Sequence, residues 1–281
     1  MKLLRFGPKG AERPGLVDGD GRIRDLGGVI DDLAGAALGP ESLARLAAID
    51  PTDLPPAAEG ARIGPCVGRV GKFVAIGLNY ADHAAEAGMA PPAEPVVFLK
   101  ATSCIAGPND DLVLPRGWTK PDWEVELGVV IGTEARYVTR EAALDHVAGY
   151  CTVNDVSERA FQAERGGTWD KGKGCDGFGP IGPWLVTRDD VPDPQALTLW
   201  LSVDGEMRQN GTTANMIFPV ADLVSYVSQF MSLQPGDIIT TGTPAGVGLG
   251  LKPPVFLKPG QVMRLAVDGL GEQRQRVVPP L

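Results

Sequence analysis

The sequence predicts a mostly β fold with some α-helix, in which a small N-terminal accessory domain precedes a larger main domain. Many short β-rich segments separated by glycine and proline follow residue 72, a pattern typical of a β-sandwich or a β-barrel. The 281 residues include 37 glycines and 25 prolines without a short repeat, which favours a globular, turn-rich chain. The alternation of strands and helices that marks a doubly wound sheet is missing.

The accessory domain is expected over residues 1–60. A turn signal at residues 18–21 separates short apolar segments, and apolar residues recur with helical spacing over residues 42–49. Paired prolines stop regular structure, so residues 51–56 are the expected linker to a main domain over residues 70–281.

The main domain is expected to combine strands with a few helices. The strands are expected at residues 73–78, 95–99, 124–131, 197–203 and 237–241. The helices are expected at residues 82–87, 140–147, 156–164 and 220–231.

Charge and composition argue against several functional classes. The net charge of −9 and the lack of a basic run argue against nucleic acid as a partner. No segment approaches the roughly 20 apolar residues that span a bilayer, and the start lacks a long apolar region, so a soluble cytoplasmic protein without a membrane partner is expected. The 4 cysteines are widely spaced and are expected to be reduced packing residues.

Two acidic residues on one predicted strand are the strongest functional signal. Side chains alternate along a strand, so Glu124 and Glu126 share one face while Trp123, Val125 and Leu127 face the core. Neighbouring buried carboxylates repel each other unless cations or hydrogen-bond donors compensate them. A divalent metal ion explains the pair best, and a solvated edge strand is the alternative.

Asp155 could be a third metal ligand. It follows an apolar stretch and opens a helical pattern, and Glu158 three residues later gives it the form of a capping box, so a cap and a ligand are equally good explanations. Three carboxylates with water and substrate oxygens would form an oxygen-only shell. Such a shell suits Mg²⁺, with Mn²⁺ or Ca²⁺ as further possibilities, and does not suit zinc.

The chain has only 2 histidines, which narrows the search for a base. On a helical turn Glu86 lies beside His83, and a carboxylate there can fix the tautomer of a water-activating imidazole. A simple surface pair is the alternative. His146 falls late in a predicted helix, where a cation complements the helix dipole, so a structural role is expected.

Further polar residues could contact an anionic substrate. Arg159 and Gln162 fall on the helical face of Asp155, where they form either a polar wall or a plain ion pair. Lys173 lies in a predicted glycine-rich loop in which backbone can approach a ligand, and Lys171 competes for the same role. Thr243 lies in a glycine-rich turn and could bind a carboxylate through its hydroxyl.

Together these segments resemble the fumarylacetoacetate hydrolase superfamily. The motifs are Asn-Tyr-x-x-His-x-x-Glu at 79–86, Glu-x-Glu at 124–126, Asn-Asp-x-x-x-Arg-x-x-Gln at 154–162, Gly-Lys at 172–173 and Gly-Asp-x-Ile-x-Thr-Gly-Thr-Pro-x-Gly-Val-Gly at 236–248. Residues 1–7 and 209–218 look most like members that hydrolyse 2,4-diketo-3-deoxy sugar acids of the L-rhamnonate and L-fuconate type. The resemblance implies a mixed β-sandwich or roll for the catalytic domain, and a homodimer.

The resemblance also assigns roles by motif. It implies that Glu124, Glu126 and Asp155 hold Mg²⁺, that His83, Glu86 and Lys173 are catalytic, and that Arg159, Gln162 and Thr243 bind substrate oxygens. Residues 80–95 resemble a lid. The implied reaction hydrolyses the C3–C4 bond of a 2,4-diketo acid to pyruvate and a hydroxy acid.

Two other functions remain open at this point. One is decarboxylation or isomerisation of a 2-keto diacid at the same metal site. The other is a non-catalytic, metal-stabilised β-sandwich that binds carbohydrate and needs neither His83 nor Lys173. The chain also departs from the family pattern: Ile76 replaces an acidic ligand of fumarylacetoacetase itself, and Gly174-Cys175 follows the lysine where many relatives have serine.

Overall fold

The computed structural model describes residues 1–280, and strands dominate it. Strands hold 31% of the residues and helices of all kinds 20%, which confirms the predicted fold class. Over residues 1–280, none of the helices combines the length and the apolar character needed to cross a membrane.

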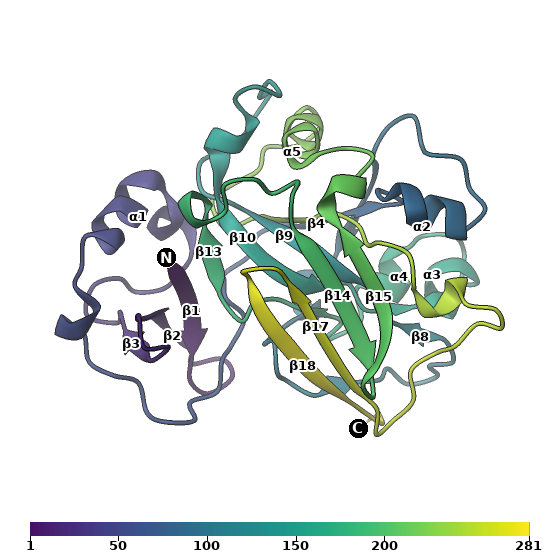
Figure 1. Ribbon diagram of the computed structural model, residues 1–281, viewed down its shortest axis with the longest axis horizontal. Coiled ribbons are helices and arrows are strands. Elements are labelled where there is room, and N and C mark those ends of the chain that lie inside the picture. The colour runs from purple at the N-terminus through teal and green to yellow at the C-terminus, as the bar shows by residue number, and fades with distance from the viewer. Residues whose placement is uncertain (281) are drawn as a thin grey trace.

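A nine-stranded sheet in the order β3-β2-β1-β13-β10-β9-β16-β4-β5 runs through the molecule (Figure 1). Its strands are β1 (Lys2–Phe6), β2 (Arg13–Val17), β3 (Ile23–Asp25), β4 (Phe73–Gly77), β5 (Val96–Lys100), β9 (Val125–Ile131), β10 (Val147–Asn154), β13 (Leu185–Thr187) and β16 (Ile238–Thr240). Among these pairs β16 and β4 are parallel and the others antiparallel. Every residue of β9 is buried, as expected for a strand that is apolar at all positions except Glu126 and Gly128.

A five-stranded sheet in the order β15-β14-β17-β18-β7 packs across β9 and β10 (Figure 1). Its strands are β7 (Leu112–Val113), β14 (Thr198–Val203), β15 (Glu206–Thr212), β17 (Val262–Val267) and β18 (Gly271–Val278). Two small pairs join β6 (Ile105–Ala106) to β12 (Gly179–Pro180) and β8 (Pro121–Asp122) to β11 (Ser157–Glu158).

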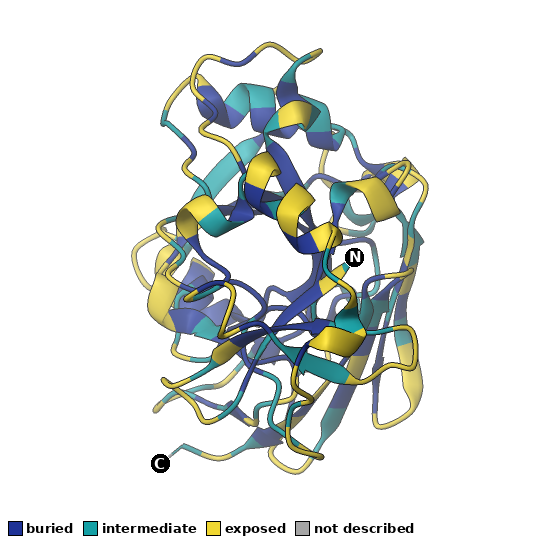
Figure 2. Cartoon of the chain, turned by 90° about the vertical axis from the view of Figure 1, so that its left-hand side faces the viewer, coloured by how far each residue is buried: buried dark blue, intermediate teal, exposed yellow. Residues whose placement is uncertain are grey.

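Short helices surround the two sheets. The α-helices are α1 (Pro40–Ala47), α2 (Ala81–Glu86), α3 (Arg159–Ala163), α4 (Asp170–Lys173) and α5 (Val220–Ser228). The 3₁₀ turns are η1 (Gly35–Leu38), η2 (Pro51–Asp53), η3 (Thr102–Cys104), η4 (Ala143–His146), η5 (Arg188–Asp190), η6 (Thr213–Asn215) and η7 (Gly248–Gly250). Figure 2 shows buried strands in the interior, whereas exposed residues concentrate in the helices and loops around them.

Buried amide side chains connect the two sheets. The Gln209 side-chain carbonyl accepts a 2.9 Å hydrogen bond from the Val125 amide, and Asn154 donates to the Gln275 side chain over 3.1 Å. Because an unpaired buried polar group is costly, these bonds fix where β9 begins and where β10 ends. Those two points carry the acidic residues of the predicted metal site.

Residues 1–60 share the main sheet. Strand β1 pairs with β13, with Lys2 opposite Val186, and the expected linker lies beside β3, where the Asp25 amide donates to the Pro55 carbonyl over 2.8 Å. The division into an accessory and a main domain stays a prediction.

The predicted elements are confirmed with two exceptions. The helix expected at 140–147 is wrong, because only the turn η4 forms there. The His146 carbonyl accepts hydrogen bonds from the amides of Gly132 and Thr133, just after β9, and the chain enters β10 at Val147. The helix expected at 156–164 begins only at Arg159, because the two preceding residues form β11 and pair with β8.

Candidate active site

A cavity of about 650 Å³ lies where β9 begins and β10 ends, between α2 on one side and α3 and α4 on the other. It gathers every site residue predicted from the sequence. These are His83, Glu86, Glu124, Glu126, Asp155, Arg159, Gln162, Lys173 and Thr243. Side chains separated by up to 160 positions therefore share one site, although their individual roles stay predictions.

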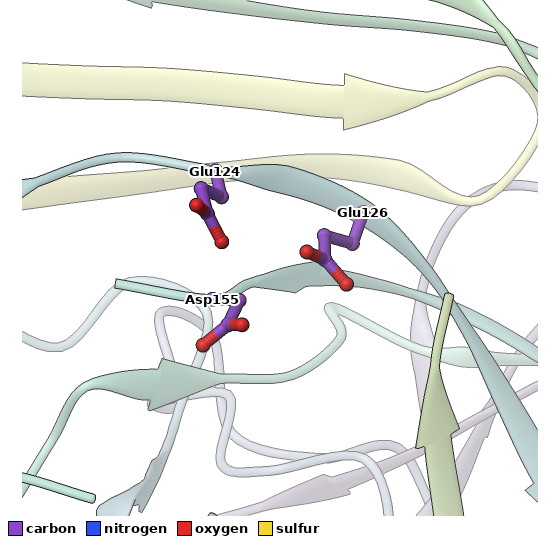
Figure 3. A group of neighbouring side chains, drawn as sticks. All are labelled: Glu124, Glu126 and Asp155. Atoms are coloured by element: carbon purple, nitrogen blue, oxygen red, sulfur yellow. The ribbon is translucent and has the colours of Figure 1, made fainter. Parts of the chain in front are cut away.

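The three acidic side chains meet at the floor of this cavity. Glu124 and Glu126 point the same way from the start of β9, as strand alternation predicts, and Asp155 follows β10, whose register brings its backbone amide 2.9 Å from the Glu124 carbonyl. One oxygen from each carboxylate lies within 4.8 Å of the others, and Figure 3 shows the three side chains gathered close together. All three side chains are buried, so the solvated-edge alternative is wrong.

Two cations compensate Glu124. The Lys173 ammonium lies 2.5 Å from one Glu124 oxygen and 2.7 Å from Asp155, and Arg159 lies 2.6 Å from the other Glu124 oxygen. Burial would raise the pKa of Glu124, but the charges of Lys173 and Arg159 outweigh it and lower the pKa to about 2. For Lys173 burial acts in the opposite direction and would lower the pKa, but the negative charges of Asp155 and Glu124 outweigh it and raise the pKa. The ammonium therefore stays charged.

Within residues 1–280, no cation contacts Glu126 in this way. Its Oε2 atom accepts hydrogen bonds from the Thr240 hydroxyl at 2.5 Å and the Gly242 amide at 2.8 Å. Burial, and then the negative charges of Asp155 and Glu124, raise the pKa of Glu126 well above its ordinary value. With Asp122, which Arg159 also contacts, four buried carboxylates share the three cations Lys100, Arg159 and Lys173, so one negative charge is left unbalanced. A divalent cation would remove that excess, and an all-oxygen donor set fits Mg²⁺, Mn²⁺ or Ca²⁺.

The capping-box interpretation of Asp155 is wrong. The N-cap of α3 is Glu158, whose carboxylate accepts from the Ala160 amide at 3.2 Å. The Asp155 side chain is bonded to the ammonium groups of Lys100 and Lys173 instead. Because strand β11 intervenes between Asp155 and the helix, the carboxylate cannot reach the first turn of α3 and faces the cavity.

His83 and Glu86 form the pair that helical spacing predicted. The Nδ1 atom of His83 lies 3.2 Å from Glu86 Oε2, and the other Glu86 oxygen accepts from the Gly246 amide at 2.9 Å. Glu86 is thus held at both oxygens and favours the tautomer with a proton on Nδ1, which leaves the lone pair on Nε2. Both side chains line the cavity and are largely buried, so the pair differs from an ordinary surface contact.

Arg159 and Gln162 lie side by side at the edge of the acidic cluster. Arg159 donates to Asp122 at 2.8 Å, to the Gln162 side-chain oxygen at 3.1 Å and to Glu124. Asp122 in turn accepts from the Gly248 amide at 2.7 Å. Arg159 therefore orients Glu124, while the NH₂ group of Gln162 remains as a donor for a ligand.

Lys173 is the last residue of the short helix α4, so the predicted loop at this position is wrong. Lys171 is excluded as its competitor, because its exposed ammonium donates to the Arg165 carbonyl at 2.6 Å. Gly172 allows α4 to lie against the chain before α3: any Cβ there would clash with the Glu158 carbonyl oxygen. This close approach carries Lys173 to the carboxylates.

Thr243 lies in the cavity wall with its hydroxyl already engaged. The hydroxyl donates to the Val125 carbonyl at 2.9 Å and accepts from Gln209 at 2.7 Å. It therefore steadies the start of β9, and binding a substrate carboxylate would require an exchange of partners.

Sequence reasoning missed several residues of the site. Asp122 continues the alternation of Glu124 and Glu126 by one more step, so extending that pattern could have found it. Lys100 ends an apolar strand, an unusual place for a buried lysine. Nothing in the sequence marked the aromatic pair Phe98 and Trp169, whose ring centroids lie 5.2 Å apart beside the cavity.

Comparison with known proteins agrees with this geometry. The family described as fumarylacetoacetate (FAA) hydrolase, C-terminal, matches residues 72–278. The chain belongs to the fumarylacetoacetate hydrolase family. A relative from Burkholderia ambifaria (strain MC40-6), provisionally named a hydrolase, is 67% identical over 276 residues, which is 98% of each chain.

Solved structures place the chain among enzymes of the same family. Maleylpyruvate hydrolase from Sphingobium sp. SYK-6, in complex with manganese(II) and pyruvate, has a TM-score of 0.82 and 31% identity over all of both chains. The 5-carboxymethyl-2-hydroxymuconate delta-isomerase from Mycobacterium smegmatis has a TM-score of 0.79 and 32% identity, again over 100% of both chains. The fumarylacetoacetate hydrolase fold is therefore common to hydrolase and isomerase activities.

Proposed function

We propose that this fumarylacetoacetate hydrolase family member is a magnesium-dependent hydrolase that cleaves the C3–C4 bond of a 2,4-diketo acid and releases pyruvate and a second acid. The observation that carries the proposal is the His83–Glu86 pair in the same cavity as the carboxylates of Glu124, Glu126 and Asp155. The manganese and pyruvate bound by the Sphingobium maleylpyruvate hydrolase support a divalent metal and this product.

The residues divide the reaction between them. A divalent ion held by the carboxylates would polarise the 2-keto and carboxylate oxygens of the substrate. His83 takes a proton on Nε2 from the water that attacks the C4 carbonyl, and Glu86 stabilises the resulting imidazolium. When the tetrahedral adduct collapses, the C3–C4 electron pair passes to C3 as a pyruvate enolate, which the proton from His83 then quenches.

Lys173 is the cation that stabilises the negative charge of the enolate. Its ammonium lies at the edge of the carboxylate cluster and 5.5 Å from the Phe98 ring, so it can reach oxygens of a substrate in the cavity. A fixed positive charge lowers the energy of an enolate that forms beside it. The NH₂ group of Gln162, which donates to no other group among residues 1–280, is a further donor for the carboxylate of the substrate.

Two observations bear on the acyl part of the substrate. The sequence resemblance favours a 2,4-diketo-3-deoxy sugar acid. Apart from the nine predicted site residues and Lys252, however, the residues that line the cavity are apolar, aromatic or glycine. They include Phe98, Trp169 and Leu249. The hydroxyl groups of a sugar acid would lack hydrogen-bond partners against such a wall, which is costly. A substrate test should therefore compare a diketo-deoxy sugar acid with an acylpyruvate that carries an apolar chain.

A second candidate is isomerisation or decarboxylation of a 2-keto diacid at the same metal site. The similarity to the mycobacterial isomerase favours it. The His83–Glu86 pair favours hydrolysis, because water activation needs an oriented base. Family membership supports an enzyme over a carbohydrate-binding module.

The test is to incubate the purified protein with a panel of acylpyruvates, diketo-deoxy sugar acids and 2-keto diacids, with and without EDTA. We expect metal-dependent release of pyruvate together with the matching acid. Release of CO₂ without an acid fragment would select decarboxylation, and a double-bond shift without cleavage would select isomerisation. Pyruvate release that EDTA leaves unchanged would rule out the proposed metal chemistry.

A further inference from the structure

Lys100 is a fully buried lysine that no step of the proposed reaction uses. It is the last residue of β5, and its side chain has no exposed area. The ammonium lies 2.5 Å from Asp155 Oδ1 and donates a second hydrogen bond to the backbone carbonyl of Lys173. Burying an ammonium group is costly because it loses its hydration. The contacts that join β5, Asp155 and the end of α4 at this lysine must therefore serve a purpose.

These contacts divide the two oxygens of Asp155. Oδ1 is bonded to Lys100, while Oδ2 lies 2.7 Å from the Lys173 ammonium, which also contacts Glu124. Asp155 can therefore offer one oxygen to the cluster. The bond from Lys100 to the Lys173 carbonyl also fixes the end of α4, from which the Lys173 side chain extends.

We propose that Lys100 is a positioning residue: it holds Asp155 with Oδ2 toward Glu124 and Glu126, and it holds the end of α4 so that Lys173 reaches the same oxygen. The inference rests on the proposed function, since it takes Asp155 to be a metal ligand. Groups that orient a metal ligand commonly change metal affinity about 10- to 100-fold when they are removed.

The direction in which metal affinity changes when Lys100 is replaced distinguishes a positioning role from a purely electrostatic one. Removing a positive charge next to a cation site would, by itself, strengthen cation binding. Loss of positioning has the opposite effect, because Asp155 is then free to turn toward Lys173 and away from Glu126. A purely structural lysine would lower stability without changing metal affinity in either direction.

Lys72 provides a matched control. Its ammonium lies 2.9 Å from the buried Asp237. The two residues immediately precede the paired strands β4 and β16, so they too form a lysine–aspartate pair at the main sheet, but neither lines the cavity. The variants are Lys100→Met, Lys100→Arg and Lys72→Met. Each is measured for thermal unfolding and, by calorimetry without substrate, for Mn²⁺ affinity.

We expect Lys100→Met to bind Mn²⁺ about 10- to 100-fold more weakly than the parent protein, Lys100→Arg to recover part of the loss, and Lys72→Met to bind normally. If Lys100→Met does not fold, Lys100→Gln replaces it with the same expected loss. Unchanged or tighter Mn²⁺ binding in the folded Lys100 variant overturns the inference, as does an equal loss in Lys72→Met. A parent protein that does not bind Mn²⁺ would instead overturn the proposed function.

Discussion

Of the three clustered carboxylates, Glu126 is the one that no cation among residues 1–280 contacts. Its Oε2 atom accepts both protein hydrogen bonds, from Thr240 and Gly242. A glutamine carbonyl can take the place of that oxygen, so Glu126→Gln removes the charge and keeps the bonds. We expect Mn²⁺ affinity to fall about 100-fold or more, while the melting temperature stays equal or rises because repulsion from Glu124 and Asp155 is lost.

Calorimetry and a thermal melt measure these two quantities. The exposed Glu206 provides the control substitution Glu206→Gln, which should alter neither. Retained Mn²⁺ binding in Glu126→Gln would remove Glu126 from the ligand set.

His83 is the predicted general base, and its substitution should separate chemistry from metal binding. We expect His83→Gln to lower kcat for pyruvate release by about 10²- to 10⁴-fold, because the water loses its proton acceptor. Mn²⁺ affinity should remain within about twofold, since the three carboxylates are unchanged. His146→Gln alters the other histidine, which is outside the cavity, and should leave both values as they are. Joint loss of turnover and Mn²⁺ affinity in His83→Gln would contradict this division of roles.

At the scale of elements, the approach of α4 to the chain before α3 decides where Lys173 lies. A Cβ at Gly172 would clash with backbone atoms, which cannot move as a flexible side chain can. We expect Gly172→Ala to destabilise the protein by about 1–3 kcal/mol and to lower kcat at least tenfold, because α4 must shift. Urea unfolding and steady-state kinetics measure the two effects. Gly19→Ala, in an open turn, is the control, and full activity in Gly172→Ala would show that Lys173 does not depend on this contact.

At the scale of the whole molecule, Arg62 joins the N-terminal segment to the loop before β7. It lies 2.8 Å from Glu12 and 2.6 Å from Asp110. Burial raises the pKa of both carboxyls, but Arg62 outweighs it, so both pKa values lie below their ordinary range. A native pKa below the unfolded value of about 4 adds stability that is present above that pH and is lost as the pH falls through the native pKa.

We therefore expect Arg62→Met to be less stable than the parent at pH 7 by about 1 kcal/mol, with a difference that shrinks below pH 4. Urea unfolding between pH 7 and pH 3 measures it. Arg276→Met removes an exposed partner of Asp111 and should change little. A stability difference that is constant across the pH range would mean that the ion pairs contribute nothing.

Homodimerisation also belongs to this scale and stays a prediction from family resemblance. Light scattering of the purified protein tests it directly.

The sequence predicted those features that depend on local spacing. Alternation along a strand placed Glu124 and Glu126 on one face, and helical spacing placed His83 beside Glu86. Apolar runs located the five predicted strands β4, β5, β9, β14 and β16 to within one residue. The ordered motifs identified the family. These features were accessible because neighbouring residues on a regular element have a fixed geometric relation.

Only the tertiary structure decided how segments distant in the chain combine. It resolved Asp155 as a member of the acidic cluster and not a helix cap, selected Lys173 over Lys171, and revealed Lys100 beneath the site. It also replaced the helix expected at 140–147 with a turn. The physical reason is shared: each outcome depends on hydrogen bonds and charges supplied by residues far away in sequence, whose positions no local pattern encodes.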